Sequence, residues 1–189
     1  MKTEYNRSGW ILAVATAWLL CSAAAVAEPR VLEWEEMIPA GWPPDDLFDD
    51  LDVDLDMLED DDPRAQELFA RVEEVWDSAP MVEELDGQSI RLAGYAIPLE
   101  GDGRNVTSFL LVPYFGACIH VPPPPRNQTV LVEMTEGNTA RIERAFATVW
   151  VTGEMKIDAG KTELATTGYT IHSTQVAPYQ QQMDDWDLE

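Results

Sequence analysis

The residues with the clearest chemical potential are a cysteine and the two histidines. Cys118 and His120 are two positions apart, and His172 is the only other histidine. On an extended backbone, side chains at this spacing point to the same face, so the pair is predicted to share one site. A thiolate and imidazoles suit zinc or copper, with His172 as a third ligand. Two alternatives stay open: a histidine that activates Cys118 as a nucleophile or redox thiol, or a small buried cysteine beside a hydrogen-bonded histidine.

The segment around this pair is rigid. Residues 122–125 are all proline, which holds the chain in polyproline II geometry and removes backbone donors, while Gly116 lets the chain turn. Rigidity of this kind suits a pre-organised site. Asn127 and Gln128 are expected to cap or bridge the proline turn through their amides, or alternatively to contact a peptide or ligand. Tyr114 is expected either to pack at the edge of the core or to stack on a ligand.

Acidic residues dominate the charge of the chain. Asp and Glu number 35 against 12 Lys and Arg, for a formal net charge of −23. Such a charge repels phosphates, so it argues against nucleic-acid binding and against docking on anionic lipid through a basic patch. It favours cations or basic partners. No Ser-His-Asp pattern, phosphate loop or nucleotide fingerprint is present, so no enzymatic reaction is predicted.

The first residues have the pattern of a secretory signal peptide. Lys2 and Arg7 precede an apolar stretch at 10–20 that is too short to cross a bilayer. Small residues at Ala25 and Ala27 predict cleavage after Ala27, with an uncleaved anchor as the alternative. The mature chain is expected to be exported and to have no membrane-spanning segment. Its one remaining cysteine forms no internal disulfide, so that thiol needs burial, a metal or a chemical role.

An acidic arm and one helix are expected before the β-rich part. Residues 28–62 combine tryptophans and prolines, expected to dock on the domain, with a run of acidic residues at 45–62. That run is predicted to be a solvated linker, with low-affinity cation binding as the alternative. An Asp-Pro N-cap starts a helix over 63–79, whose apolar stripe is expected to be a packing face. Residues 181–189 are expected to be a frayed acidic tail.

Residues 80–180 are predicted to fold as a small β-barrel. Asp86-Gly87 is a strong two-residue turn signal and predicts a hairpin between residues 81–85 and 88–99. Further strand-like runs follow at residues 108–113, 129–134, 146–157 and 169–173. Five or six short strands favour a closed or nearly closed barrel, with an OB-like barrel as a candidate, because closure removes exposed strand edges. The predicted fold class is mainly β with one helix.

Two segments carry a family resemblance. Residues 85–100, LDGQSIRLAGYAIPLE, and residues 109–128, FLLVPYFGACIHVPPPPRNQ, resemble the bacterial family catalogued as domain of unknown function 3299. The resemblance covers roughly residues 80–180, and Arg126 stands where the family often continues with proline. It implies an exported, periplasmic protein of a Gram-negative bacterium without an established activity.

The same resemblance favours a connection to metal. Some members of that family are encoded beside components of ABC-type transport systems, including ones linked to zinc supply. The resemblance thus implies a metal-associated accessory protein, with Cys118 and His120 as the positions carried over. The leading functional prediction is a non-enzymatic, zinc-binding or accessory module of an envelope transport system. The alternative is a structural or interaction protein whose Cys-x-His-tetraproline loop is only architectural.

Overall fold

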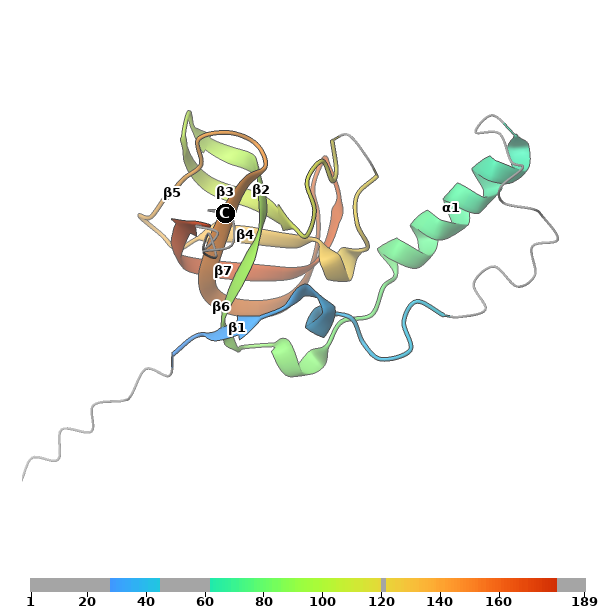
Figure 1. The fold of residues 1–189 in the computed structure, drawn as a ribbon, viewed down its shortest axis with the longest axis horizontal. Helices are drawn as coiled ribbons and strands as arrows, with labels where there is room; N and C mark the ends of the chain where they lie inside the picture. Colours follow the sequence, from blue (N-terminus) through green and yellow to red (C-terminus); the bar gives the residue numbers. More distant parts are fainter. Residues whose placement is uncertain (1–27, 45–61, 120–121, 180–189) are drawn as a thin grey trace, which may run out of the picture.

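The computed structural model describes residues 28–44, 62–119 and 122–179, and its centre is a β-barrel (Figure 1). The barrel strands are β2 (Ser89–Asp102), β3 (Asn105–Val112), β4 (Val130–Met134), β6 (Ala147–Lys161) and β7 (Thr166–Pro178). Two shorter strands extend the sheet, β1 (Arg30–Leu32) and β5 (Ala140–Arg141). A single α-helix within the described residues, α1 (Pro63–Asp77), precedes the barrel.

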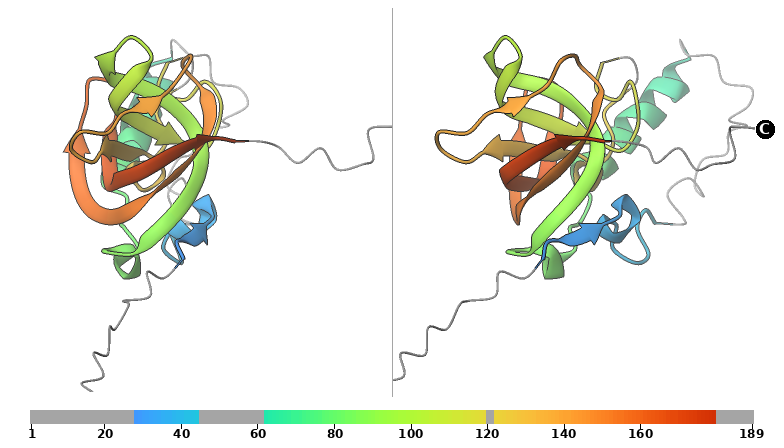
Figure 2. Two further views of the ribbon diagram at one scale, coloured as in Figure 1. Left: turned by 90° about the vertical axis from the view of Figure 1, so that its left-hand side faces the viewer. Right: turned by 60° about the vertical axis from the view of Figure 1, so that its left-hand side comes forward.

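The five barrel strands close into a ring, which the end-on view of Figure 2 shows. β2 pairs antiparallel with both β3 and β6, β3 pairs with β4, and β6 pairs with β7. A parallel β4–β7 pair completes the ring. Counted within the barrel, the strand order is 1-2-3-5-4-1, the arrangement of the OB-fold. The predicted fold, mainly β with one helix and a small closed barrel, is confirmed.

One predicted strand pairing is wrong. Glu83–Leu85 forms a 3-10 turn, η3, so Asp86-Gly87 does not join two strands of a hairpin. Gly87, with φ +75°, donates its N–H to the Met155 carbonyl at 2.7 Å, and the Asp86 carboxylate accepts the Ile157 N–H at 3.0 Å. The turn is used to hold β6 beside the start of β2. Because β2 pairs with β1, β3 and β6, the segment before it has no free strand edge to occupy.

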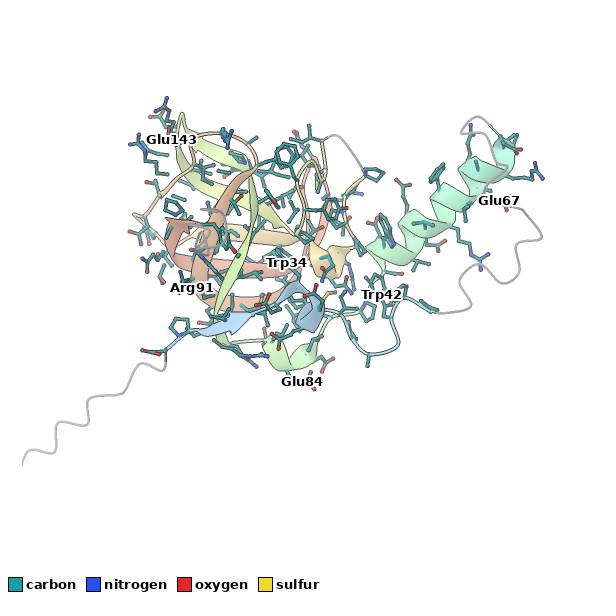
Figure 3. All side chains as sticks on the ribbon, in the orientation of Figure 1. Trp34, Trp42, Glu67, Glu84, Arg91 and Glu143 are labelled. Carbon is teal, nitrogen blue, oxygen red and sulfur yellow. The ribbon has the colours of Figure 1, made fainter. Side chains whose placement is uncertain are left out.

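The N-terminal arm is part of the folded core. β1 pairs in parallel with the start of β2, and a 3-10 turn, η1 (Trp34–Met37), follows it. The Trp34 indole N–H donates to the Ala93 carbonyl at 2.7 Å (Figure 3). Its ring lies so close to Gly94 that a Cβ there would come within 3.0 Å of it. Met37 is fully buried. The arm therefore supplies side chains to the core of the barrel.

The barrel interior holds the larger of two hydrophobic clusters, called the interior cluster. It contains Leu32, Met37, Leu85, Ile90, Leu92, Ala96, Val106, Phe109, Leu111, Val130, Val132, Ala140, Ile142, Val149, Val151, Met155, Tyr169 and Ile171. On β2, Ile90 and Leu92 are buried while Arg91 between them points outward (Figure 3). Its guanidinium lies over the Trp150 ring at 4.4 Å. This period of two is what a strand with one inward face requires.

Helix α1 begins as the sequence predicts but contributes nothing to the interior cluster. The Asp62 carboxylate accepts hydrogen bonds from the Arg64 guanidinium at 2.7 Å and from the Arg64 backbone N–H at 2.9 Å, and these lower the pKa of Asp62 to about 2. Ala65 is the buried residue of the described helix, whereas Phe69 is 56% exposed. Figure 1 shows the helix extending away from the barrel. The other members of its apolar stripe, Leu68, Val72, Val75 and Trp76, are half-buried but do not belong to the interior cluster, so the packing face stays a prediction.

Several predictions concern residues outside the described ranges. The signal peptide with its cleavage site, the acidic run at 45–61, His120 and the tail at 181–189 all lie there. Those assignments stay predictions. Among the described residues, no helix is both long enough and apolar enough to cross a membrane.

Candidate functional site

Cys118 lies in a turn and not on an extended segment. Its φ of +64° is in the left-handed region, and Gly116 has φ +90°. The N–H of Ile119 donates to the Gly116 carbonyl at 3.4 Å. The expectation that Cys118 and His120 project from one face of an extended chain is therefore wrong at Cys118, because a left-handed residue breaks the alternation of side chains.

Cys118 packs against a second hydrophobic cluster on the outside of the barrel, called the outer-wall cluster. Its buried members are Ile97, Leu110, Val112, Ala117, Phe146 and Ala165, and the partly buried residues against them are Tyr95, Leu99, Cys118 and Leu131. Leu110 alternates along β3 with interior residues Phe109 and Leu111, which places it on the outer face. Burial here raises the pKa of the Cys118 thiol to about 11. The thiol is neutral near pH 7, which disfavours a nucleophilic thiolate.

His172 lies on the outer face of β7, next to a carboxylate. Its Nδ1 is 3.5 Å from an oxygen of Glu133 on β4, and both side chains are half exposed. Glu154 of β6 lies opposite His172 on the other side. Within the described ranges, no three His, Cys, Asp or Glu side chains gather to hold a metal ion. Cys118 and His172 therefore belong to no such group among the described residues, and the ligand set that also includes His120, which lies outside them, stays a prediction.

The two amides after the prolines tie separate segments together. They lie in the 3-10 turn η4 (Arg126–Gln128). The Asn127 Nδ2 donates to the Pro80 carbonyl at 3.1 Å, and the Gln128 Nε2 donates to the Trp34 carbonyl at 2.8 Å. Asn127 is fully buried and Gln128 is 9% exposed. Their amides thus hold the arm and the segment after α1 against the barrel, and they are not on the surface where a ligand would meet them.

Two aromatic residues form the rim of the Cys118 loop. Tyr114 and Phe115 are both exposed. The ring of Phe115 is tilted against that of Phe146 at 4.8 Å and lies edge-on to that of Tyr95 at 6.1 Å. Partial burial and the neighbouring Cys118 raise the pKa of Tyr114. Phe115 therefore covers one end of the outer-wall cluster, while Tyr114 stays accessible to solvent.

The rest of the outer-wall cluster is not fully covered. A groove of 660 Å³, called the outer-wall groove, lies between the outer faces of β2, β3 and β4 and the loop that joins β6 to β7. Leu99 and Leu131 belong both to the lining of this groove and to the residues packed on the outer-wall cluster. Its charged lining residues are Glu100, Glu133, Lys161 and Glu163. The groove therefore combines an apolar floor with a mainly acidic rim.

A second space, of 330 Å³, borders the same loop and is called the proline pocket. Residues 161–164 line both spaces. Glu73, Trp76 and Asp77 at the end of α1, the prolines at 122–124 and residues 165–166 form the remaining walls. The tetraproline segment is thus one wall of a concave surface next to the outer-wall groove.

Comparison with known proteins shows which family the chain belongs to. A family model described as a protein of unknown function, DUF3299, matches residues 34–178. The chain belongs to the DUF3299 family. A crystal structure of a DUF3299 family protein from Pseudomonas aeruginosa is 37% identical, with a TM-score of 0.61, and the match covers 82% of this chain and 98% of that chain. Among curated proteins, no significant match is found.

The DUF3299 assignment confirms the predicted family and extends the matched region beyond residues 80–180. The match begins at Trp34, whose indole is bonded to β2, so the arm belongs to the family domain. It ends at the last residue of β7. The DUF3299 region therefore includes the whole barrel, the proline loop and both walls of the outer-wall groove.

Sequence reasoning missed the outer-wall groove of this DUF3299 protein, although one signal was present. Residues 109–112 and 130–132 are continuous apolar runs and do not alternate with polar residues. Continuous runs indicate strands that are buried on both faces, and they contain Leu110 and Leu131 of the outer wall. No comparable signal identifies Glu163, because its loop reaches the groove only through barrel closure.

Proposed function

We propose that this DUF3299 protein is a non-catalytic, periplasmic binding module whose ligand lies in the outer-wall groove. The observation that carries the proposal is an apolar floor, continuous with a buried cluster, that stays open on the outside of a closed barrel. Concave surfaces with apolar walls and a few polar groups are where proteins usually bind ligands. The groove also lies on β3 and β4, which are the second and third strands of the OB-like barrel. OB-fold barrels use the face of these two strands for binding.

The Cys-x-His-tetraproline loop has an architectural role in this proposal. The Arg126 Nε donates to the Ala79 carbonyl at 2.7 Å, and the Thr129 hydroxyl donates to the Pro124 carbonyl at 3.2 Å. These two donors beside the prolines therefore serve internal contacts. Burial keeps the Cys118 thiol neutral. These features favour a loop that supports the groove over one that carries out a reaction.

A ligand selection tests the binding function. The wild type is offered random displayed peptides and an oligosaccharide array, beside Ser108→Trp, which places an indole in the groove. Glu136→Trp places the same ring in the turn after β4, outside the groove, and serves as the matched control. We expect ligands that bind the wild type and Glu136→Trp but not Ser108→Trp. Finding no ligand in either collection, or only ligands that bind all three folded proteins equally, would overturn the proposal.

Zinc held by Cys118 and His120, in the service of an envelope transport system, is a separate and second proposal. Its support is that Cys118 is a free cysteine that is only half buried, so a metal ion can reach the sulfur. The raised pKa of the thiol opposes it, since metal binding requires the thiolate. Elemental analysis of protein purified without chelator or affinity histidines, beside Cys118→Ser, tests it. Zinc near one per chain, lost in the variant, is expected; a wild type without zinc would refute it.

A further inference from the structure

The rim of the outer-wall groove is built from three neighbouring strands in fixed register. Glu100 on β2 pairs with Ser108 on β3, and Ser108 pairs with Glu133 on β4. Because adjacent strands are about 4.8 Å apart, the two glutamates stand on backbones about 10 Å apart, with the small Ser108 between them. Leu131 is two residues from Glu133 on the same strand, so it belongs to the same outer face. Carboxylates thus flank a low, partly apolar floor.

The charge of this rim is not balanced within the described part of the molecule. The Glu133 carboxylate lies 3.5 Å from Nδ1 of His172. Glu100 and Glu163 have no ion-pair partner among the described residues. Lys161 is the one basic group of the described lining. The rim therefore attracts cationic groups and repels phosphates. A nucleic acid, a ligand of many OB-like barrels, would bring its phosphates against these carboxylates and does not fit.

We infer that the outer-wall groove binds an extended segment of a partner polypeptide that is both basic and apolar. The inference rests on the proposed binding function and specifies its ligand. Apolar side chains of the segment cover Leu99 and Leu131. Lys and Arg side chains lay their aliphatic stems along the same surface and bring their charged ends to Glu100 and Glu133. Because the groove is open to solvent along the barrel wall, it suits an extended chain better than an enclosed small molecule.

The proline pocket continues the same chemistry on the neighbouring surface. Trp76 lines it together with the carboxylates of Glu73 and Asp77. An ammonium or guanidinium group over an indole face gains cation–π energy, and nearby carboxylates add to it. Residues 161–164 line both spaces, so a chain that crosses this loop meets Glu163 at each side. One basic side chain of the segment is therefore assigned to the proline pocket.

Two short labelled peptides test the inference on the mature full chain by fluorescence anisotropy. One alternates Lys with Leu, and its matched partner alternates Glu with Leu. We expect the Lys-Leu peptide to bind and the Glu-Leu peptide to fail. Glu133→Lys and Glu163→Lys are each expected to weaken binding about tenfold. Glu136→Lys makes the same change in net charge in the turn after β4 and is expected to change binding by less than about twofold.

The outcomes separate the inference from the proposed function. Equal weakening by Glu136→Lys and Glu133→Lys would mean that the peptide responds to net charge alone. Equal binding of the Glu-Leu and Lys-Leu peptides would mean that the rim does not select basic side chains. Either result overturns the inference. A neutral or acidic ligand that binds the wild type but not Ser108→Trp would overturn the inference and leave the proposed binding function standing. If Glu133→Lys fails to fold, Glu163→Lys in the exposed loop makes the same test.

Discussion

The two hydrophobic clusters of the barrel differ in what encloses them. The interior cluster is surrounded by all five barrel strands, and Leu32 and Met37 of the arm join it, so that most of its members have no exposed surface. The outer-wall cluster is covered by loop residues such as Ala117 and Phe146, and a groove lies beside it. Backbone pairing of the five strands encloses the interior cluster without gaps. The loops over the outer-wall cluster cover only the area that their own side chains reach.

This difference shows that barrel closure explains only one of the two apolar faces of β3 and β4. Phe109 and Leu111 point into the barrel, as any barrel strand requires. Leu110 is buried in the outer-wall cluster, whereas Leu131 is only partly buried and lines the open groove. Apolar surface that stays accessible on a folded protein usually marks a place of interaction. The interior cluster therefore serves stability, and the outer-wall groove is the proposed place of binding.

The largest expected effect comes from truncating one leucine in each cluster. Leu92→Ala removes a fully buried side chain from the interior cluster and is expected to lower the free energy of unfolding by about 2–5 kcal/mol. Leu131→Ala, at the floor of the groove, is expected to cost about 1 kcal/mol because its site is already partly open. Urea unfolding followed by tryptophan fluorescence measures both. Equal losses for the two variants would erase the distinction between the clusters.

An intermediate loss of stability is expected from removing a hydrogen bond between the arm and the barrel. Gln128→Met keeps the volume of the side chain but removes the donor to the Trp34 carbonyl, so we expect a loss of about 1–2 kcal/mol in the free energy of unfolding. Gln66→Met, on the exposed surface of α1, is the matched control and is expected to stay within about 0.5 kcal/mol. A Gln128→Met variant as stable as the control would mean that the arm does not help to enclose the interior cluster.

The fold could be predicted from sequence further than the site. The strand runs, the Asp62 N-cap and the family motif are local signals, and each describes a segment that the structure contains. The Asp86-Gly87 signal failed because a two-residue turn states where the chain bends but not which strands it joins. Pairing is decided by barrel closure, which brings β6 beside the start of β2.

The site was harder to predict because its parts come from distant segments. Cys118 was predicted as a site residue from its residue type alone. Its left-handed turn and its apolar surroundings follow from packing that no short motif encodes. Glu100, Glu133 and Glu163 are three among many acidic residues in the chain, and only the strand register and the β6–β7 loop place them around one groove. Chemistry-bearing residue types were therefore a weaker guide than apolar runs on the outward faces of strands.

The smallest expected effect concerns the reactivity of Cys118, which is half-buried against the outer-wall cluster. Burial raises the pKa of its thiol from 9.0 to about 11, so its thiolate fraction at pH 8 is about 100-fold lower than that of an ordinary cysteine. Higher intrinsic nucleophilicity recovers part of this loss, so alkylation by iodoacetamide is expected to be about tenfold slower in folded than in urea-unfolded protein of residues 28–189, in which Cys118 is the one cysteine. The folded-state rate should keep rising until the pH passes about 11. Fast alkylation with a midpoint below pH 9 would instead identify an activated thiol, and the loop would then belong with a reactive site and not with the cover of the cluster.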